Sequence, residues 1–191
     1  MDPTLEDIPA AASVTIYADG AASPNPGRGG YGVVILHQGN RHELSGGFRA
    51  TTNNRMELMG AIAGLRALQS LPLPGGCKAK VTLYSDAKYL VDMFNGGHAA
   101  KWRQNGWTRN KGKDKACNHD QWHELLTLAE RHDVNMVWVK GHSSNLENAH
   151  CDELAVAARQ REDLPPDEGY ENPSPPRPAE ARPQTRVDWI Q

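Results

Sequence analysis

The pattern of apolar and polar positions predicts that strands alternate with helices through most of the chain. Apolar runs typical of β-strands lie at residues 14–17, 31–37, 41–48, 81–84 and 134–139. Gly39-Asn40, between the second and third runs, favours a tight turn. Helical spacing of apolar residues lies between about 54 and 69, and again at 87–94, 120–131 and 146–160. Asn54 followed three residues later by Glu57 has the form of a capping box, so we expect Asn54 to cap the first helix.

The order of these elements predicts an α/β fold. An antiparallel meander of three strands followed by strand–helix–strand units implies a five-stranded mixed sheet flanked by helices. We expect a flexible N-terminal extension at residues 1–12, one compact domain at 13–161 and a disordered tail at 162–191. The tail is rich in Pro, Glu, Asp and Arg, so it cannot bury enough apolar surface to offset the entropy of ordering.

Charge is distributed unevenly along the chain. The formal net charge is −2, but residues 162–191 hold seven acidic residues and three arginines, which leaves the preceding part at +2. Residues 101–115 contain six basic residues and one acidic residue. A basic segment that also carries tryptophans can hold a nucleic-acid backbone by charge and stack on its bases. We therefore expect nucleic-acid contacts from Lys101, Trp102, Arg103 and Trp107, with one of the two tryptophans in the core.

Other features of the sequence bear on the location of the protein and on its partners. No stretch approaches the ~20 apolar residues of a membrane span, and the first 13 residues do not resemble a secretory signal. The three cysteines form no Cys-x-x-Cys pair, so reduced thiols and a cytoplasmic location are expected. Nothing in the sequence requires an obligate protein partner or more than a monomer. Trp122 and Trp138 lie within amphipathic elements and are expected in the core.

Four acidic residues lie in separate local motifs. Asp19 and Asp86 end β-type runs, whereas Glu57 and Asp152 lie on predicted helices. Carboxylates gathered at one place raise each other's pKa unless cations hold them, and the strand ends of open α/β sheets form ligand sites. Oxygen ligands without histidine favour Mg²⁺ or Mn²⁺. Two such ions ~3.5–4 Å apart could activate a water and stabilise a leaving oxygen, so metal-assisted phosphoryl chemistry is expected.

Several polar residues lie near these acids in the predicted fold. His142 follows the last strand on a glycine-flanked loop, which suits transient proton transfer, although an exposed loop histidine is the simpler interpretation. Asn25 and Asn53 offer amide donors that could read the 2′-hydroxyl groups of RNA. The hydroxyl of Thr52 could hold a phosphate.

Six motifs, in this order along the chain, closely resemble those of bacterial type 1 ribonuclease H (ribonuclease HI). They are Tyr17-x-Asp19-Gly20, Asn25-Pro26-Gly27, Thr51-Thr52-Asn53-Asn54-Arg55-Met56-Glu57-Leu58, Ser85-Asp86, Trp138-Val139-Lys140-Gly141-His142 and Cys151-Asp152-Glu153-Leu154-Ala155. The resemblance covers residues 14–158. It implies a ribonuclease H-like fold and endonucleolytic hydrolysis of the RNA strand in RNA–DNA hybrids, leaving 5′-phosphate and 3′-hydroxyl ends.

The resemblance also implies roles for individual residues. Asp19, Glu57, Asp86 and Asp152 would be catalytic and bind two Mg²⁺ ions when substrate is present, with Mn²⁺ as a possible substitute. His142 would assist turnover or product release. The amides that would line the groove of the hybrid are those of Asn25, Asn53 and Asn54. Residues 101–115 would match the basic protrusion with which family members grip the DNA strand.

The chain departs from the family pattern at four positions. Ala21 and Ala87 replace serines, which removes two hydroxyls close to the metals, and Ala50 stands where an arginine often assists phosphate binding. Lys88 stands where a neutral groove-contacting side chain is common, so we expect it to contact substrate.

Two alternatives remain open at the level of sequence. A non-catalytic hybrid-binding module could keep the fold and the basic segment, but binding alone gains nothing from concentrated acids beside phosphates. The same catalytic fold could instead cut another phosphodiester substrate, such as a DNA recombination intermediate. Amides suited to 2′-hydroxyl recognition favour RNA over that alternative.

Overall fold

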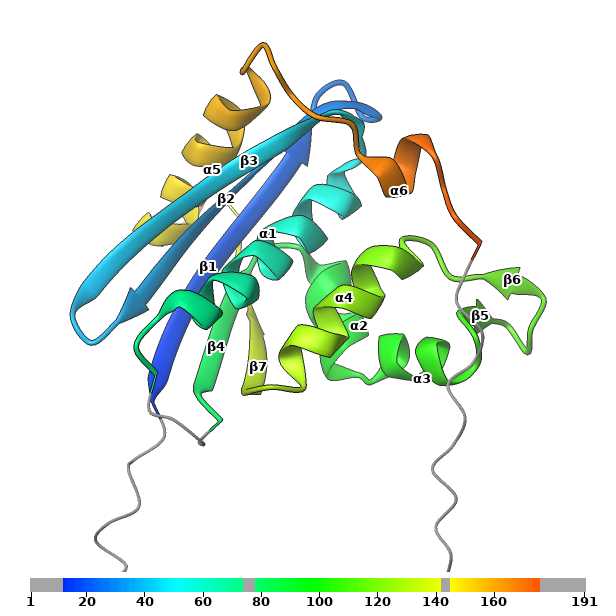
Figure 1. The fold of residues 1–191 in the computed structure, drawn as a ribbon, viewed down its shortest axis with the longest axis horizontal. Helices are drawn as coiled ribbons and strands as arrows, with labels where there is room; N and C mark the ends of the chain where they lie inside the picture. Colours follow the sequence, from blue (N-terminus) through cyan, green and yellow to red (C-terminus); the bar gives the residue numbers. More distant parts are fainter. Residues whose placement is uncertain (1–11, 74–77, 142–144, 176–191) are drawn as a thin grey trace, which may run out of the picture.

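A computed structural model describes residues 12–73, 78–141 and 145–175, and its centre is a five-stranded mixed sheet (Figure 1). Its strands are β1 Ser13–Ala22, β2 Gly27–His37, β3 Asn40–Thr51, β4 Lys80–Ser85 and β7 Asp133–Trp138. They lie in the order β3-β2-β1-β4-β7. The first three pair antiparallel, whereas β4 runs parallel to β1 and β7 parallel to β4. The predicted α/β fold with a mixed sheet is confirmed.

Helices cover both faces of the sheet (Figure 1). One face carries α1 Asn53–Ala67 with its 3-10 extension η2 Leu68–Ser70, α2 Lys88–Asn95, α3 His98–Gln104 and α4 His119–Ala129. The core lies between this helical layer and the sheet, where Leu58 and Ile62 of α1 pack with Ile16 and Leu83 of the strands. None of the helices within the described ranges is long and apolar enough to cross a membrane.

The other face carries α5 Leu146–Arg159, which packs across β1, β2 and β3. The helix lies directly on the backbone of β2, because a Cβ atom on Gly32 would lie 2.1 Å from the carbonyl oxygen of Cys151. Only a residue without a side chain permits this approach. The position of α5 is therefore set by backbone contact rather than by an adaptable layer of side chains.

The first helix begins two residues earlier than the capping box predicts. Thr52 is the N-cap, with extended φ and ψ of −127° and 160°, and its Oγ1 accepts from the backbone N–H of Arg55 at 3.4 Å. Asn54 is already helical. The chain leaves β3 in extended geometry at Thr51, so the next residue meets the backbone requirement of an N-cap. The prediction that Asn54 caps the helix is wrong.

Residues 101–115 form a protrusion, named the basic protrusion, that runs from α3 into two short paired strands (Figure 1). These are β5 Thr108–Arg109 and β6 Asp114–Lys115. Trp107 is 1% exposed and packs edge-on near His123, so its predicted contact with nucleic acid is wrong and it is the tryptophan in the core. Trp102 is half-buried and packs edge-on against Trp122.

The predicted disorder of residues 162–191 is wrong for residues 162–175. Residues 164–172, named the C-terminal strap, cross to the start of α1 and include a short helix, α6 Glu168–Glu171 (Figure 1). The backbone N–H of Arg49 donates to the carbonyl oxygen of Pro165 at 3.0 Å. Residues 1–11 and 176–191 lie outside the described part of the chain.

A buried ion pair holds the C-terminal strap. Asp167 is 3% exposed and accepts from Nε and Nη2 of Arg55 at 2.7 and 2.6 Å and from Thr51 Oγ1 at 2.6 Å. Arg55 also donates two hydrogen bonds to Asp120 at the start of α4. Disorder is predicted because these residues contribute little apolar surface to a core. The strap is instead ordered by buried, charge-assisted hydrogen bonds, which amino-acid composition does not reveal.

Replacing Asp167 with Ala should destabilise the fold by about 3 kcal/mol, because it leaves a buried guanidinium with one of its two carboxylate partners. Urea unfolding measures the loss. The matched control is Glu171→Ala on the same strap. Glu171 pairs with Arg49 and is more exposed than Asp167, so its loss should cost less than about 1 kcal/mol. Equal losses in the two variants would contradict a dominant role for the buried pair.

Candidate active site

Three carboxylates converge at one end of the sheet. Asp19 lies on β1, Asp86 directly follows β4, and Glu57 lies in the second turn of α1. One oxygen from each lies within 4.8 Å of the other two. The parallel register aligns Tyr17 with Tyr84, so Asp19 and Asp86 each lie two residues further along neighbouring strands. The packing of α1 against β1 brings in Glu57.

The electrostatics of this group disfavour negative charge. Burial holds the pKa of Glu57 well above its usual range, and the nearby carboxylates of Asp19 and Asp86 raise it further. A hydrogen bond from the backbone of Gly20 acts in the opposite direction. Within the described part of the chain, Oε2 of Glu57 is buried and has no hydrogen-bond partner. Asp19 is 8% exposed, and its Oδ1 accepts from the Gly20 N–H at 2.7 Å.

These features fit a hard divalent cation. The three converging ligand atoms are all carboxylate oxygens, which suit such ions better than Zn²⁺. A dication among them would replace repulsion with attraction and would give the unpartnered Glu57 oxygen a ligand role. The buried unpaired oxygen is the structural sign that distinguishes this group from an ordinary acidic surface.

The fourth predicted acid lies outside this group of three. Asp152 is half-buried on α5, and it is near enough to raise the pKa of Glu57 by repulsion. Its oxygens are not among those within 4.8 Å of one another. Asp152 reaches the group from α5, on the opposite face of the sheet, and its role as the fourth ligand stays a prediction.

The loop after β7 passes directly against the acids. A Cβ atom on Gly141 would lie 2.4 Å from Oδ2 of Asp86, so a side chain at this position would require the Asp86 carboxylate to shift. His142, the predicted proton-transfer residue, lies outside the described residues, as do 143 and 144. The described chain resumes at Asn145, which caps α5 by accepting from the Asn148 N–H at 3.1 Å.

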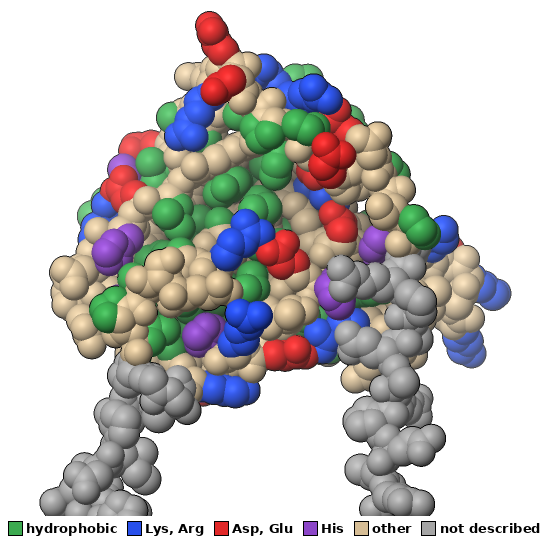
Figure 2. Space-filling model, viewed as in Figure 1, with side chains coloured by type: hydrophobic (Ala, Val, Ile, Leu, Met, Phe, Trp, Pro, Cys, Tyr) green, Lys and Arg blue, Asp and Glu red, His purple; other side chains and the backbone are tan. Residues whose placement is uncertain are grey.

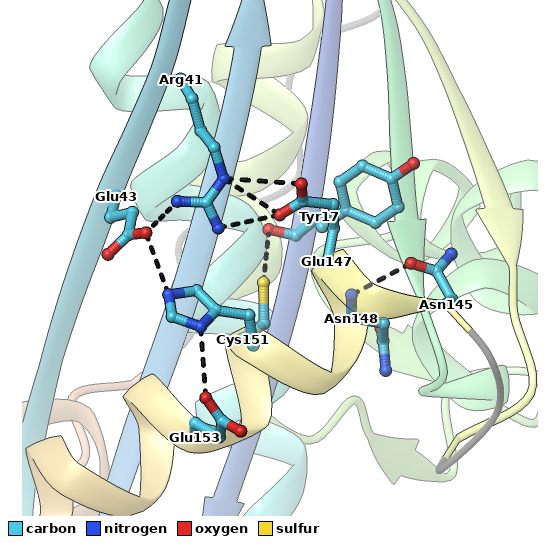
Figure 3. Close-up of polar contacts among 9 residues, drawn as sticks. Tyr17, Arg41, Glu43, Asn145, Glu147, Asn148, Cys151 and Glu153 are labelled. Atoms are coloured by element: carbon cyan, nitrogen blue, oxygen red, sulfur yellow. Dashed lines mark hydrogen bonds and ion pairs between the residues drawn. The ribbon is translucent and has the colours of Figure 1, made fainter.

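A polar network fixes the N-terminal half of α5 against the sheet (Figure 3). Arg41 of β3 pairs with Glu43 and donates to Glu147 of α5, the latter at 2.9 Å. Nε2 of His150 lies 2.9 Å from Glu43. On the inner side, the Cys151 thiol donates to the carbonyl oxygen of Tyr17 at 3.3 Å, and burial raises its pKa to about 12. This thiol is therefore a packing group rather than a nucleophile.

The predicted groove residues gather at the start of α1. Asn25 Oδ1 accepts from the Asn53 N–H at 3.2 Å, and Asn53 Oδ1 accepts from the Ala22 N–H at 2.7 Å. Both side chains are exposed, as is Asn54. Because the amide oxygens are used to fix the loop, their NH₂ groups are the parts oriented for a ligand.

Trp138 is a residue of the site that sequence reasoning misplaces in the core. It is 47% exposed, and its Nε1–H donates to the carbonyl oxygen of Asp86 at 3.0 Å. The ammonium of Lys88 lies 6.0 Å from the centre of its ring. The ring is exposed because β7 is an edge strand and Trp138 is its last residue. The sequence signal that could have placed Trp138 at the site is its position two residues before the Lys140-Gly141-His142 loop.

Arg103 of the basic protrusion is largely committed to the fold. Its side chain is mostly buried and forms an ion pair with Glu130 at the end of α4. The predicted contact of Arg103 with nucleic acid stays a prediction. By contrast, Lys101 lines an open cleft of about 690 Å³ together with Arg109 and Lys111.

Glu57→Gln should raise stability at pH 7 without divalent metal, because it replaces an ionised carboxylate buried beside Asp19 and Asp86 with a neutral amide. The folded-state pKa of Glu57 is raised, so wild-type stability falls as pH rises from the ordinary glutamate pKa through the folded-state value. The variant lacks this loss, and the difference should vanish near pH 4. Urea unfolding in EDTA at both pH values measures it, with exposed Glu162→Gln as the control. A variant less stable than wild type at pH 7 would contradict the electrostatic account.

Comparisons with known proteins agree with this geometry. Residues 11–160 match the family model described as RNase H. The chain is 55% identical over 159 residues to a ribonuclease H of Rippkaea orientalis, covering 83% of this chain and 93% of that protein. It is 54% identical over 159 residues to a ribonuclease HI of Synechocystis sp., covering 83% and 94%.

Solved structures give the same result. The chain is similar to LC9-RNase H1, with a TM-score of 0.66, 30% identity, and coverage of 80% of this chain and 74% of that one. It is also similar to LC11-RNase H1 in complex with an RNA/DNA hybrid, with a TM-score of 0.59, 26% identity, and coverage of 76% and 95%. The match of sequence, fold and converging carboxylates leads to one conclusion: this chain belongs to the ribonuclease H family of enzymes.

Proposed function

We propose that this protein is an endoribonuclease that hydrolyses the RNA strand of RNA–DNA hybrids with two Mg²⁺ ions, leaving 5′-phosphate and 3′-hydroxyl ends. The observation that carries the proposal is the convergence of Asp19, Glu57 and Asp86, with a buried oxygen on Glu57 that has no partner among the described residues. Mn²⁺ is expected to substitute for Mg²⁺, since both take oxygen ligands. A hybrid is favoured as substrate because LC11-RNase H1, a relative in fold, is solved in complex with one.

Each of the four acids would have a role in this mechanism. Asp19, Glu57 and Asp86 would hold the ions, and Asp152 would complete the ligands from α5. The bound ions would supply an activated water and stabilise the leaving oxygen. Asp19 is held in place by the Gly20 N–H, and Glu57 would be kept ionised by the ions against the effect of its burial. His142 would move a proton at the leaving group or assist product release, from a loop anchored at Gly141.

Substrate would lie across the start of α1 and the basic protrusion. Asn25, Asn53 and Asn54 would donate to 2′-hydroxyls and base edges in the minor groove. Thr52 would donate its hydroxyl hydrogen to a phosphate while its oxygen caps the helix. Figure 2 shows Lys and Arg side chains gathered around β5 and β6, where they would meet the DNA backbone. Within the basic protrusion, Lys101 and Trp102 line the open cleft.

The two alternatives fit the site less well. A non-catalytic binding module would gain nothing from three converging carboxylates, since they repel phosphates unless cations intervene. A nuclease acting on DNA alone would have no use for amide donors held at the start of α1. We also infer a monomer and a cytoplasmic location; the location is supported by Cys117 and Cys151, which are free thiols in the described part of the chain.

Asp86→Asn should lower cleavage of a labelled RNA–DNA hybrid by about 100- to 1,000-fold or more, the usual cost of removing one electrostatic group from a reacting centre. Binding of the hybrid should persist. The assay compares hybrid, single-stranded RNA and duplex DNA, with and without Mg²⁺, and wild type should cut the hybrid only with metal. Hybrid binding without cleavage by wild type would favour the binding module, and equal cutting of duplex DNA would favour the other alternative.

Changing Lys111, Lys113 and Lys115 together to Gln should weaken hybrid binding more at low salt than at high salt. Each lost phosphate contact lowers the slope of log K against log salt by about 0.7–0.9. Fluorescence anisotropy of labelled hybrid measures the slope. The control changes Lys78 and Lys80 to Gln; both are exposed at the opposite end of the sheet, and their slope should match wild type. A salt-independent loss would show that the protrusion acts through its structure.

A further inference from the structure

Trp138 differs from the other tryptophans of the described chain. Trp107 and Trp122 are buried in the core, and Trp102 packs against it, whereas Trp138 presents nearly half of its surface to solvent. A large apolar ring left in water forgoes the free energy that burial would supply. Tryptophan is enriched at binding interfaces, because its ring is apolar while its N–H can form a hydrogen bond.

The exposed ring is also fixed in orientation. Trp138 is in register with Ser85 on the neighbouring parallel strand, and its indole N–H donates to the carbonyl oxygen of Asp86. One edge of the ring is therefore attached to the backbone of a proposed metal ligand, while the rest faces outward. A ring already held in one orientation loses little conformational entropy when a ligand stacks on it.

Lys88 adds positive charge to this surface. It is two residues beyond Asp86 and is the first residue of α2, and its ammonium lies 6.0 Å from the centre of the Trp138 ring. Its side chain is 71% exposed, and its pairing with Asp92 at 3.3 Å is an exposed contact of the i,i+4 type. Exposed pairs of this type contribute little stability, so a phosphate can readily compete for the ammonium.

We propose that Trp138 and Lys88 form a subsite for the strand being cut, in which the indole stacks on a sugar or base next to the scissile phosphate and the ammonium binds a neighbouring phosphate. The proposal rests on the proposed function and adds a contact to it. Nucleic acid is the occupant because the surface pairs an aromatic face with a cation. The indole is also hydrogen-bonded to the backbone of Asp86, beside which the proposed function places a phosphodiester. It is separate from the basic protrusion, which begins at Lys101.

The test measures hybrid binding in an Asp86→Asn background, which keeps the Asp86 carbonyl but should not cut. Trp138→Ala should weaken binding about 5- to 100-fold, the range for loss of one stacked base, while Trp138→Phe should bind within about threefold of the parent because it keeps a ring. Lys88→Gln should reduce the salt slope by about 0.7–0.9. Tyr170→Ala, an exposed aromatic on α6, and Lys80→Gln are the matched controls and should match the parent.

The same variants in the otherwise wild-type chain separate this proposal from the proposed function. Trp138→Ala should raise KM for the hybrid by a similar factor, whereas Trp138→Phe should restore it. If wild type cuts the hybrid and neither the Trp138 nor the Lys88 variants change KM or binding, the subsite is refuted and the proposed function stands. If wild type does not cut the hybrid, the proposed function fails, and the anisotropy results still decide the subsite. Thermal unfolding of each variant identifies misfolding, and failure of Trp138→Phe to restore binding in a folded protein also refutes stacking.

Discussion

Repulsion among three converging carboxylates is the constraint on which this structure depends. Asp19, Glu57 and Asp86 place oxygens within 4.8 Å of one another, and burial adds a desolvation cost that falls most heavily on Glu57. No local interaction would hold such a group together. It is held because β1, β4 and α1 are fixed by the apolar core, whose burial opposes the repulsion. The fold therefore stores an electrostatic strain at one rim of the sheet, which a bound divalent cation would relieve.

The ion pairs of Arg55 with Asp120 and Asp167 hold the start of α1, the helix that carries Glu57. Arg55 lies two residues before Glu57, and its guanidinium joins three segments that are distant in sequence: α1, the start of α4 at Asp120, and the C-terminal strap at Asp167. The same turn of α1 presents the amides of Asn53 and Asn54. The strap is thus part of the framework that holds α1, although it lies beyond residues 11–160, which match the family.

Much of the site can be predicted because its signals are local. Asp19 and Asp86 each end an apolar run, and parallel neighbours bring such ends together, so their convergence follows from the order of elements. The place of Asp152 could not be predicted in this way, because it depends on how closely α5 approaches β2. The exposure of Trp138 depends on which strand lies at the edge of the sheet. The order of the C-terminal strap depends on a charge pair between residues 55 and 167, which composition does not register.

Gly32 has a consequence that reaches beyond packing. It carries no reactive group and lies on a strand that supplies none of the three converging acids, yet a single methyl group there would displace the helix that carries Asp152. Selection for catalysis would therefore constrain this glycine as strictly as it constrains an acidic side chain of the site. A search of related sequences for reactive side chains would pass over this position, although the reach of the fourth acid depends on it.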